Sequence, residues 1–162
     1  MCLHPESIPP VPENTARVAK AAFPKGNRYM RLRDELGIFY NDEEFAELYP
    51  ERGQSAIAPW RLTMILIMQF LENLSDRQTA DAVRGRIDWK YALSLELEDD
   101  GLDFSVLSEF RARLIEGSKE KQILDKMLSK FGELGLLKSR RKARTDSTHI
   151  LAAVKELTRL EH

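Results

Sequence analysis

The sequence predicts an all-α fold, a multi-helix bundle packed around one buried helix. Residues 58–74, read APWRLTMILIMQFLENL, are apolar at almost every position between Leu62 and Leu71. A helix that is apolar on all sides has to be covered on all sides. The segments before and after it carry apolar residues at helical spacing and are bounded by capping residues and glycines, so they are expected to supply the cover.

The central helix is predicted from about Pro59 to Asn73. Proline is tolerated at the first helical position, because its missing N–H would be unpaired there in any case. The apolar stretch is shorter than the ~20 residues that a membrane span needs, so no membrane contact is expected. A core helix is a better interpretation than a cofactor-binding segment.

Three shorter elements are expected before the central helix. Residues 1–12 contain four prolines and predict an extended arm. Asn14 or Thr15 is expected to cap a short helix that ends at Ala22. The next two helices are predicted over residues 27–36, stopped by Gly37, and over residues 41–49, opened by a capping-box variant of Asn41 and Glu44.

Four helices are predicted after the central one. Ser75 is a good N-cap for the first of them, and Thr79, Ala80 and Val83 would face inward. An acidic loop, residues 95–103, separates the second from the third. The predicted ranges are 76–84, 87–95, 106–115 and 119–134, and the apolar stripe of the third is Val106, Leu107, Phe110 and Leu114.

The bulk composition fits a globular protein of one domain, or one domain and part of another. The formal net charge is −1, so any nucleic-acid binding has to come from local patches. The single cysteine, Cys2, excludes a disulfide framework and a cysteine zinc site. The first ten residues do not have the pattern of a signal peptide. A cytoplasmic location is therefore expected, and it would be nucleoid-associated if the partner is DNA, as considered below.

The predicted helices 59–74 and 76–84 are joined by a short turn and followed by helix 87–95, an order compatible with a helix-turn-helix element. Arginine and glutamine side chains on the second helix could contact base edges or phosphates. From spacing alone, a solvated helix face is the better interpretation. The candidate DNA contacts are Arg77, Gln78, Arg84, Arg86 and Lys90.

Arg111 and Arg113 form a second cationic pair, on the helix predicted over residues 106–115. The alternative is a structural arginine, paired with an acid such as Asp103 of the neighbouring loop. The closeness of that loop in the sequence favours the structural interpretation.

Residues 138–144 form a basic run in which five of seven side chains are cationic. Such a cluster could bind phosphates with an affinity that falls steeply with salt. A solvated linker is an equally good interpretation of the composition. The candidate phosphate contacts are Arg140, Arg141 and Lys142.

Asp146 is a further candidate, within the segment 144–149. Metal-assisted phosphoryl transfer needs at least two carboxylates on a divalent ion, and a lone aspartate is more often a cap or turn residue. Ser147 and Thr148 have no histidine base at a recognisable spacing, which disfavours a nucleophilic hydrolase.

Three motifs, in the same order, resemble the N-terminal region of bacterial insertion-sequence transposases of the IS1182-like and IS5-like group. The first is GQSAIAP before the apolar helix, followed by LSDRQ. The second, DFSVLSEFRARL at residues 103–114, is similar to the family pattern D-x-S-T-L-S-x-F-R-x-R-L. The third, TDSTHI at residues 145–150, is similar to x-D-S/G-T-x-I.

The resemblance implies a helical N-terminal domain that helps to recognise transposon ends, followed by a ribonuclease-H-like catalytic domain with a DDE triad. Asp146 would match the first aspartate of that triad and would be a ligand of the Mg²⁺ pair used by the full-length enzyme. The other two carboxylates have no counterpart here. The chain is therefore expected to bind no cofactor and to be catalytically inactive on its own.

The resulting division of the chain assigns residues 1–25 to an arm and short helix and 26–137 to the helical transposase N-terminal domain. Residues 138–159 are expected to be a basic linker and the truncated start of the catalytic domain, and 160–162 a tag remnant. The expected partner is DNA of the transposon terminal repeats. The alternatives are a dimerisation or interaction module of the transposase, with a homodimer as partner, and a stand-alone helix-turn-helix regulator.

Overall fold

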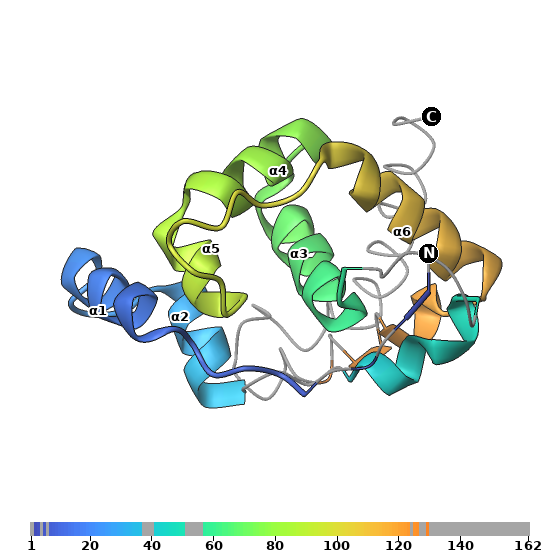
Figure 1. Ribbon diagram of the computed structural model, residues 1–162, viewed down its shortest axis with the longest axis horizontal. Coiled ribbons are helices and arrows are strands. Elements are labelled where there is room, and N and C mark those ends of the chain that lie inside the picture. Colours follow the sequence, from blue (N-terminus) through green and yellow to red (C-terminus); the bar gives the residue numbers. More distant parts are fainter. Residues whose placement is uncertain are drawn as a thin grey trace, which may run out of the picture. The chain divides into compact units, whose positions relative to one another are not determined.

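The computed structural model describes residues 2–3, 5, 7–36, 41–50, 57–123, 125–126 and 129. The chain divides into two compact units, Met1–Phe104 and Ser105–His162, which are described separately. The elements of the described residues are all helical, as predicted (Figure 1). They are α1 (Glu13–Ala22), α2 (Arg28–Arg31), η1 (Leu32–Leu36), η2 (Asp42–Leu48), α3 (Pro59–Glu72), α4 (Asp76–Gly85), α5 (Ile87–Ala92) and α6 (Phe104–Glu116).

Helix α3 is the predicted central helix. Pro59 occupies its first turn, and the helix ends before Asn73, which has a left-handed backbone (φ 55°) of the kind that asparagine tolerates. Its start is fixed by a contact that the sequence did not indicate, since the Trp60 N–H donates to the buried carboxylate of Asp42 (3.1 Å). The side chains buried along α3 are Pro59, Trp60, Leu62, Thr63, Met64, Ile65, Ile67, Met68 and Gln69.

The capping prediction for the first helix was wrong. Helix α1 begins at Glu13, its N-cap position is Pro12, and no side chain caps it. The Thr15 hydroxyl is fully buried and donates instead to the Leu95 carbonyl (2.7 Å), so it is committed to a tertiary contact.

The predicted helix 27–36 changes from α-helical to π-helical geometry partway along. The Asn27 side chain caps α2 by accepting from the Met30 N–H (3.0 Å), and the chain then continues as the π-helical turn η1. The predicted helix 41–49 is a 3₁₀ helix, η2, at whose start the Asn41 N–H donates to the Glu44 carboxylate.

Helix α5 is shorter than predicted and ends at Ala92 rather than Leu95. Ser94 adopts a left-handed backbone (φ 54°), and its hydroxyl joins two distant groups. It donates to the Pro9 carbonyl (3.0 Å) and accepts from the Arg33 guanidinium (2.8 Å). These contacts hold the proline-rich arm against η1 and α5.

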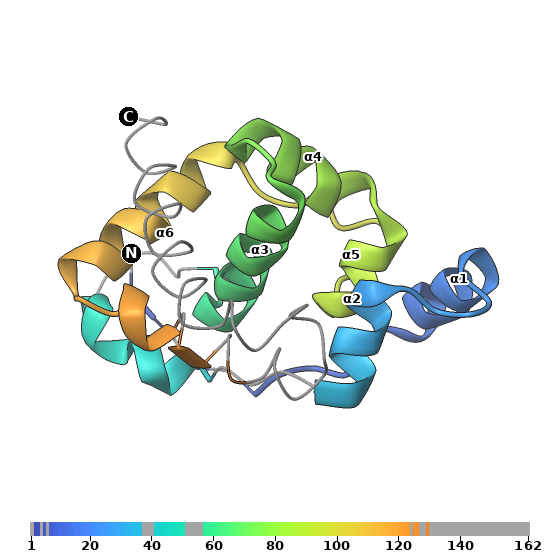
Figure 2. The same cartoon turned by 180° about the vertical axis from the view of Figure 1, so that it is seen from behind.

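Helices α1 and α2 both pack against α5, as both views of the first unit show (Figure 1, Figure 2). Ala19, Met30 and Tyr91 form a buried cluster there, flanked by Val11, Ala16, Phe23 and Ile87. In α5 itself every side chain after Ile87 is buried, including the charged residues Asp88 and Lys90.

In the second unit, α6 buries Leu107, Phe110 and Leu114 of the predicted stripe, whereas Val106 is only half-buried. The described residues that follow, up to 129, include part of the predicted helix 119–134. Residues 130–162, and with them the predicted basic linker, start of the catalytic domain and tag remnant, lie outside the described residues. None of the described helices has the length and apolar character to cross a membrane.

Candidate nucleic-acid interface

The turn between α3 and α4 is fixed by hydrogen bonds from both helices. In the capping box of α4, the Ser75 hydroxyl accepts from the Gln78 N–H (3.1 Å), and the Ser75 N–H donates to Gln78 Oε1 (2.9 Å). On the α3 side, the buried Gln69 amide donates to the Leu74 carbonyl (3.1 Å) and to the Asp76 carboxylate (2.8 Å). The two helices are therefore joined by a tight turn that hydrogen bonds from both of them hold, and we call this unit the α3–α4 hairpin.

Helix α4 has one buried and one exposed face. Asp76, Thr79, Ala82 and Val83 are buried, while Arg77, Gln78, Asp81, Arg84 and Gly85 are exposed. The Arg77 guanidinium lies 4.3 Å from the centre of the Phe104 ring, which supports the extended side chain. All three predicted contacts on this element, Arg77, Gln78 and Arg84, thus share one solvent-facing surface, which we call the α4 face. The other two, Arg86 and Lys90, lie beyond the end of α4.

Arg86 does not belong to the α4 face, because internal partners hold its guanidinium. It forms ion pairs with Glu72 (2.7 Å) and Asp88 (2.8 Å) and lies over the rings of Tyr29 and Trp89. Burial alone would lower the pKa of Arg86, but the two carboxylates outweigh it and raise that pKa. Its geometry is that of a structural cation.

Glu72, at the end of α3, is the centre of this polar network. Its carboxylate accepts from the Tyr29 hydroxyl (2.5 Å), from Arg86, and from Trp89 Nε1 (3.2 Å). Asp88 extends the network by accepting from the Asn27 amide (3.0 Å). The network therefore ties α2 and α5 to the end of α3, beside the start of the hairpin turn.

Because of this network, the free energy of unfolding is expected to depend on pH in the acidic range. Burial by itself would raise the pKa of Glu72, but the hydrogen bonds from Arg86 and Tyr29 hold it below the ordinary value of 4.5. A carboxyl whose pKa is lowered by folding contributes stability above that ordinary value and loses it as the pH falls through the folded pKa. We expect urea midpoints of wild type and Glu72→Gln to differ at pH 6 and to converge as the pH falls below 4.5. Glu96→Gln, on an exposed loop, is the control and should follow wild type throughout; parallel curves for Glu72→Gln and wild type would contradict the prediction.

Lys90 is also placed inside the protein. It is 3% exposed, and its ammonium group donates to the Asp99 carbonyl (2.6 Å). Burial lowers its pKa, and the carboxylates of Asp99 and Asp100 act in the opposite direction. This placement argues against the predicted DNA contact, and Lys90 is left out of the candidate interface.

In the second unit, Arg111 is 1% exposed, which fits the structural interpretation.

One further set of exposed cations was not indicated by any sequence motif. Between Asn14 and Arg33 the chain has six Lys or Arg residues and no Asp or Glu. A sliding charge count would have found this segment, but it contains no motif and lies outside the predicted helix-turn-helix. The exposed members are Arg17, Lys20, Lys25, Arg28 and Arg31.

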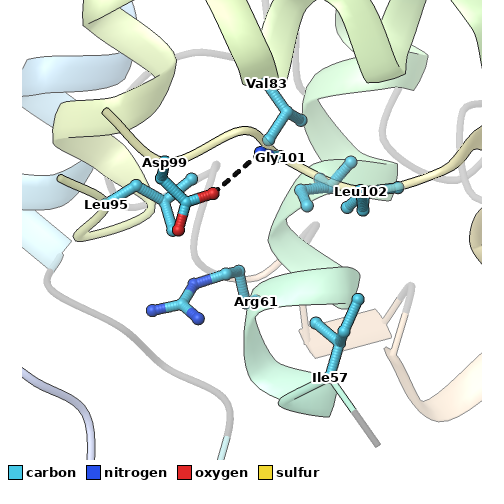
Figure 3. A pocket seen from close by; sticks show the side chains of 8 residues that line it. Ile57, Arg61, Val83, Leu95, Asp99, Gly101 and Leu102 are labelled. Atoms are coloured by element: carbon cyan, nitrogen blue, oxygen red, sulfur yellow. Dashed lines mark hydrogen bonds between the residues drawn. The ribbon is translucent and has the colours of Figure 1, made fainter. Parts of the chain in front are cut away.

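A small cavity lies between α3, α4 and the acidic loop (Figure 3), with a volume of about 130 Å³. The polar groups at its wall already have partners. Arg61 Nε donates to the Leu93 carbonyl (3.0 Å), and the Asp99 carboxylate accepts from the Gly101 N–H (2.8 Å). Ligand pockets are usually about 300–1,000 Å³, so this cavity is a packing gap rather than a substrate site.

No group of three or more His, Cys, Asp or Glu side chains that could hold a metal ion occurs among the described residues. Asp146, Arg140, Arg141 and Lys142 lie outside those residues, so the contacts predicted for them stay predictions.

A family model described as a transposase domain (DUF772) matches residues 17–113, more than half of the chain. The chain belongs to this transposase-domain family. The match runs from α1 into α6 and includes the α3–α4 hairpin and the whole basic segment from Arg17. No curated protein and no solved structure matches the chain. The resemblance to transposases is therefore confirmed at the level of the family.

Proposed function

We propose that this transposase-domain protein binds DNA through the α4 face, with transposon terminal repeats as its target. The observation that carries the proposal is the placement of Arg77, Gln78 and Arg84 together on the exposed side of a rigidly capped helix. Helix-turn-helix proteins place the second helix of such a pair in the major groove, which supports the proposal. A DNA target would place the protein at the nucleoid.

The chemistry of the α4 face suits a duplex. Arginine can bind guanine edges or phosphates, and glutamine can contact base edges in the major groove. Asp81 lies on the same face and would repel phosphates. The face is therefore better suited to base edges within a groove than to tracking along one phosphate strand.

The proposal predicts a large loss of binding when the α4 face is reversed in charge. Arg77→Glu/Arg84→Glu should weaken binding of a duplex selected from a randomised pool on the wild-type chain by about 100-fold, since each lost arginine contact costs about 1–3 kcal/mol. Fluorescence anisotropy measures this, with circular dichroism to check folding. Lys119→Glu/Lys121→Glu, in the second unit, changes the charge equally and should retain most of the affinity. Wild-type affinity in the α4 variant would refute the proposal.

An interaction module is the second candidate, favoured by the net charge of −1 and by Asp81 among the α4 cations. In this case the domain would form a homodimer and DNA would be contacted elsewhere. Sedimentation distinguishes the two: a concentration-dependent mass that the α4 reversal abolishes, without loss of DNA binding, would support the module.

The catalytic role in this proposal applies to transposases that carry all three carboxylates of the DDE triad. In the IS1182-like and IS5-like transposases that the chain resembles, Asp146 would correspond to the first carboxylate of the DDE set. Mg²⁺ held by such a set supplies the activated nucleophile and stabilises the leaving oxygen. For residues 17–113 the proposed activity is DNA binding alone.

A further inference from the structure

We propose that α1, α2 and the turn between them form a second DNA-contacting surface, which holds the phosphate backbone without reading sequence. We call it the basic platform and define it by the exposed side chains of Arg17, Lys20, Lys25, Arg28 and Arg31. The inference rests on the proposed function, because it assigns a further surface for the same partner.

Charge is distributed unevenly along the chain. The whole chain has 25 basic and 26 acidic residues, yet the segment from Asn14 to Arg33 has six basic residues and no acidic one. The charge elsewhere is correspondingly negative. A local field of this kind attracts polyanions even when the net charge of the protein is close to zero.

The basic platform is held in place by buried contacts. On its inner side, α1 buries Thr15 and Ala19, and α2 buries Tyr29 and Met30. The Thr15 hydroxyl binds the Leu95 carbonyl, and Ala19, Met30 and Tyr91 pack as one cluster. Little conformational entropy is therefore lost by the backbone when a partner binds.

The charges of the basic platform are spaced at helical intervals. Arg17 and Lys20 are three residues apart on α1, and Arg28 and Arg31 are three apart on α2, so each pair shares a helix face. Within the part of the chain that the structure describes, Arg17 donates to the Asn14 side chain (3.2 Å), and Arg28 donates to the Tyr29 hydroxyl (3.0 Å). Both of these partners are neutral, so neither contact is an ion pair that an external anion would have to displace.

Several acidic side chains of the described residues flank the basic platform. The Asp34 carboxylate accepts from the Tyr91 hydroxyl (2.6 Å), the Glu72 carboxylate is bound by Arg86, and the Asp88 carboxylate is bound by Asn27 and Arg86. These three carboxylates are thus engaged by hydrogen bonds. Glu13 is exposed at the start of α1, one helical turn before Arg17 and at the far end of the helix from Lys20.

Duplex DNA suits the basic platform better than a membrane. Membrane-surface helices insert large apolar side chains such as Trp, Phe or Leu below their cations. Here the exposed apolar residues of α1 are only Ala21 and Ala22.

Helix α5 contacts α1, α2 and α4 within the first unit, so it links the basic platform to the α4 face (Figure 2).

The test is the salt dependence of binding. Each phosphate contact lowers the slope of log K against log salt by about 0.9. The variant is Arg17→Gln/Lys20→Gln/Lys25→Gln, and the probe is a mixed-sequence, fluorescein-labelled duplex. We expect this triple variant to make the slope shallower by about 2–3. It should also weaken binding by at least about tenfold at low salt. The preference for the selected over the mixed duplex should not change. The control Lys119→Gln/Lys121→Gln/Lys126→Gln should keep the wild-type slope.

Each other outcome has a defined meaning. A wild-type slope in the triple variant overturns the basic platform, and so does binding to phosphatidylserine vesicles in place of the duplex. If wild type shows no preference for any selected duplex while the triple variant still changes the slope, the α4 proposal fails and the basic platform stands. If the triple variant loses its folded circular dichroism spectrum, Lys20→Gln/Lys25→Gln replaces it, with an expected change of about 2.

Discussion

Replacing Glu72 by alanine is expected to lower the free energy of unfolding by about 3 kcal/mol and the Tm by about 10 °C. The substitution removes the acceptor for the Tyr29 hydroxyl and for Trp89 Nε1, both on buried side chains, and one of the two carboxylates paired with Arg86. A buried donor left without an acceptor costs about 1–3 kcal/mol. Urea denaturation followed by tryptophan fluorescence measures the change, because Trp89 contacts the altered site.

The control for this experiment is Glu96→Ala, which removes an exposed carboxylate from a loop of the same unit. Its free energy of unfolding should stay within about 0.5 kcal/mol of wild type, as for most surface changes. A loss below 1 kcal/mol in Glu72→Ala would mean that water replaces the carboxylate and that the network is not central to stability.

Replacing Gln69 by leucine is expected to destabilise the protein by about 2–3 kcal/mol, although it makes α3 more apolar. Gln69 is 1% exposed, and its amide joins the Leu74 carbonyl to the Asp76 carboxylate across the hairpin turn. Leucine would take a donor away from the buried Asp76 carboxylate. Thermal unfolding followed by circular dichroism measures the loss.

Gln122→Leu is the matched control, the same change at an exposed position, and should leave the Tm almost unaltered. The prediction also has a functional side, because a loosened turn should weaken the binding attributed to the α4 face. A Gln69→Leu protein as stable as wild type would show that burial of the leucine offsets the lost hydrogen bonds.

The sequence was most informative where the determinants are local. The apolar run of α3, the Ser75 N-cap and the inward Thr79 and Val83 are set by residues within one or two turns, and these were predicted. The reciprocal bond of Gln78 in the cap was not predicted, and Ala80, expected to face inward, is only half-buried, while Ala82 is buried. The all-α class follows from such local patterns. Helix ends that depend on tertiary contacts were predicted less well: α5 stops early because Ser94 binds Pro9 and Arg33, which are 85 and 61 residues away.

The candidate site could be predicted only in part, for a related reason. Charge and position on a helix made Arg86 and Lys90 resemble Arg77 and Arg84 in the sequence. The difference lies in their partners, Glu72 and Asp88 for Arg86 and the Asp99 carbonyl for Lys90, which only the folded backbone brings within reach. The cations between Asn14 and Arg33 were overlooked for the opposite reason, because they form a surface without forming a motif.

The capping box restricts which bases Gln78 can distinguish. A bidentate contact to adenine needs the amide oxygen to accept from N6 while the amide nitrogen donates to N7. In α4 that oxygen points back at the Ser75 N–H, so the side chain offers a duplex only its NH₂ group. Gln78 could therefore donate to any base edge that presents an acceptor, which is adenine N7, guanine N7 or O6, or thymine O4, and would disfavour cytosine. The bidentate contact that singles out adenine would require the first turn of the helix to give up its cap.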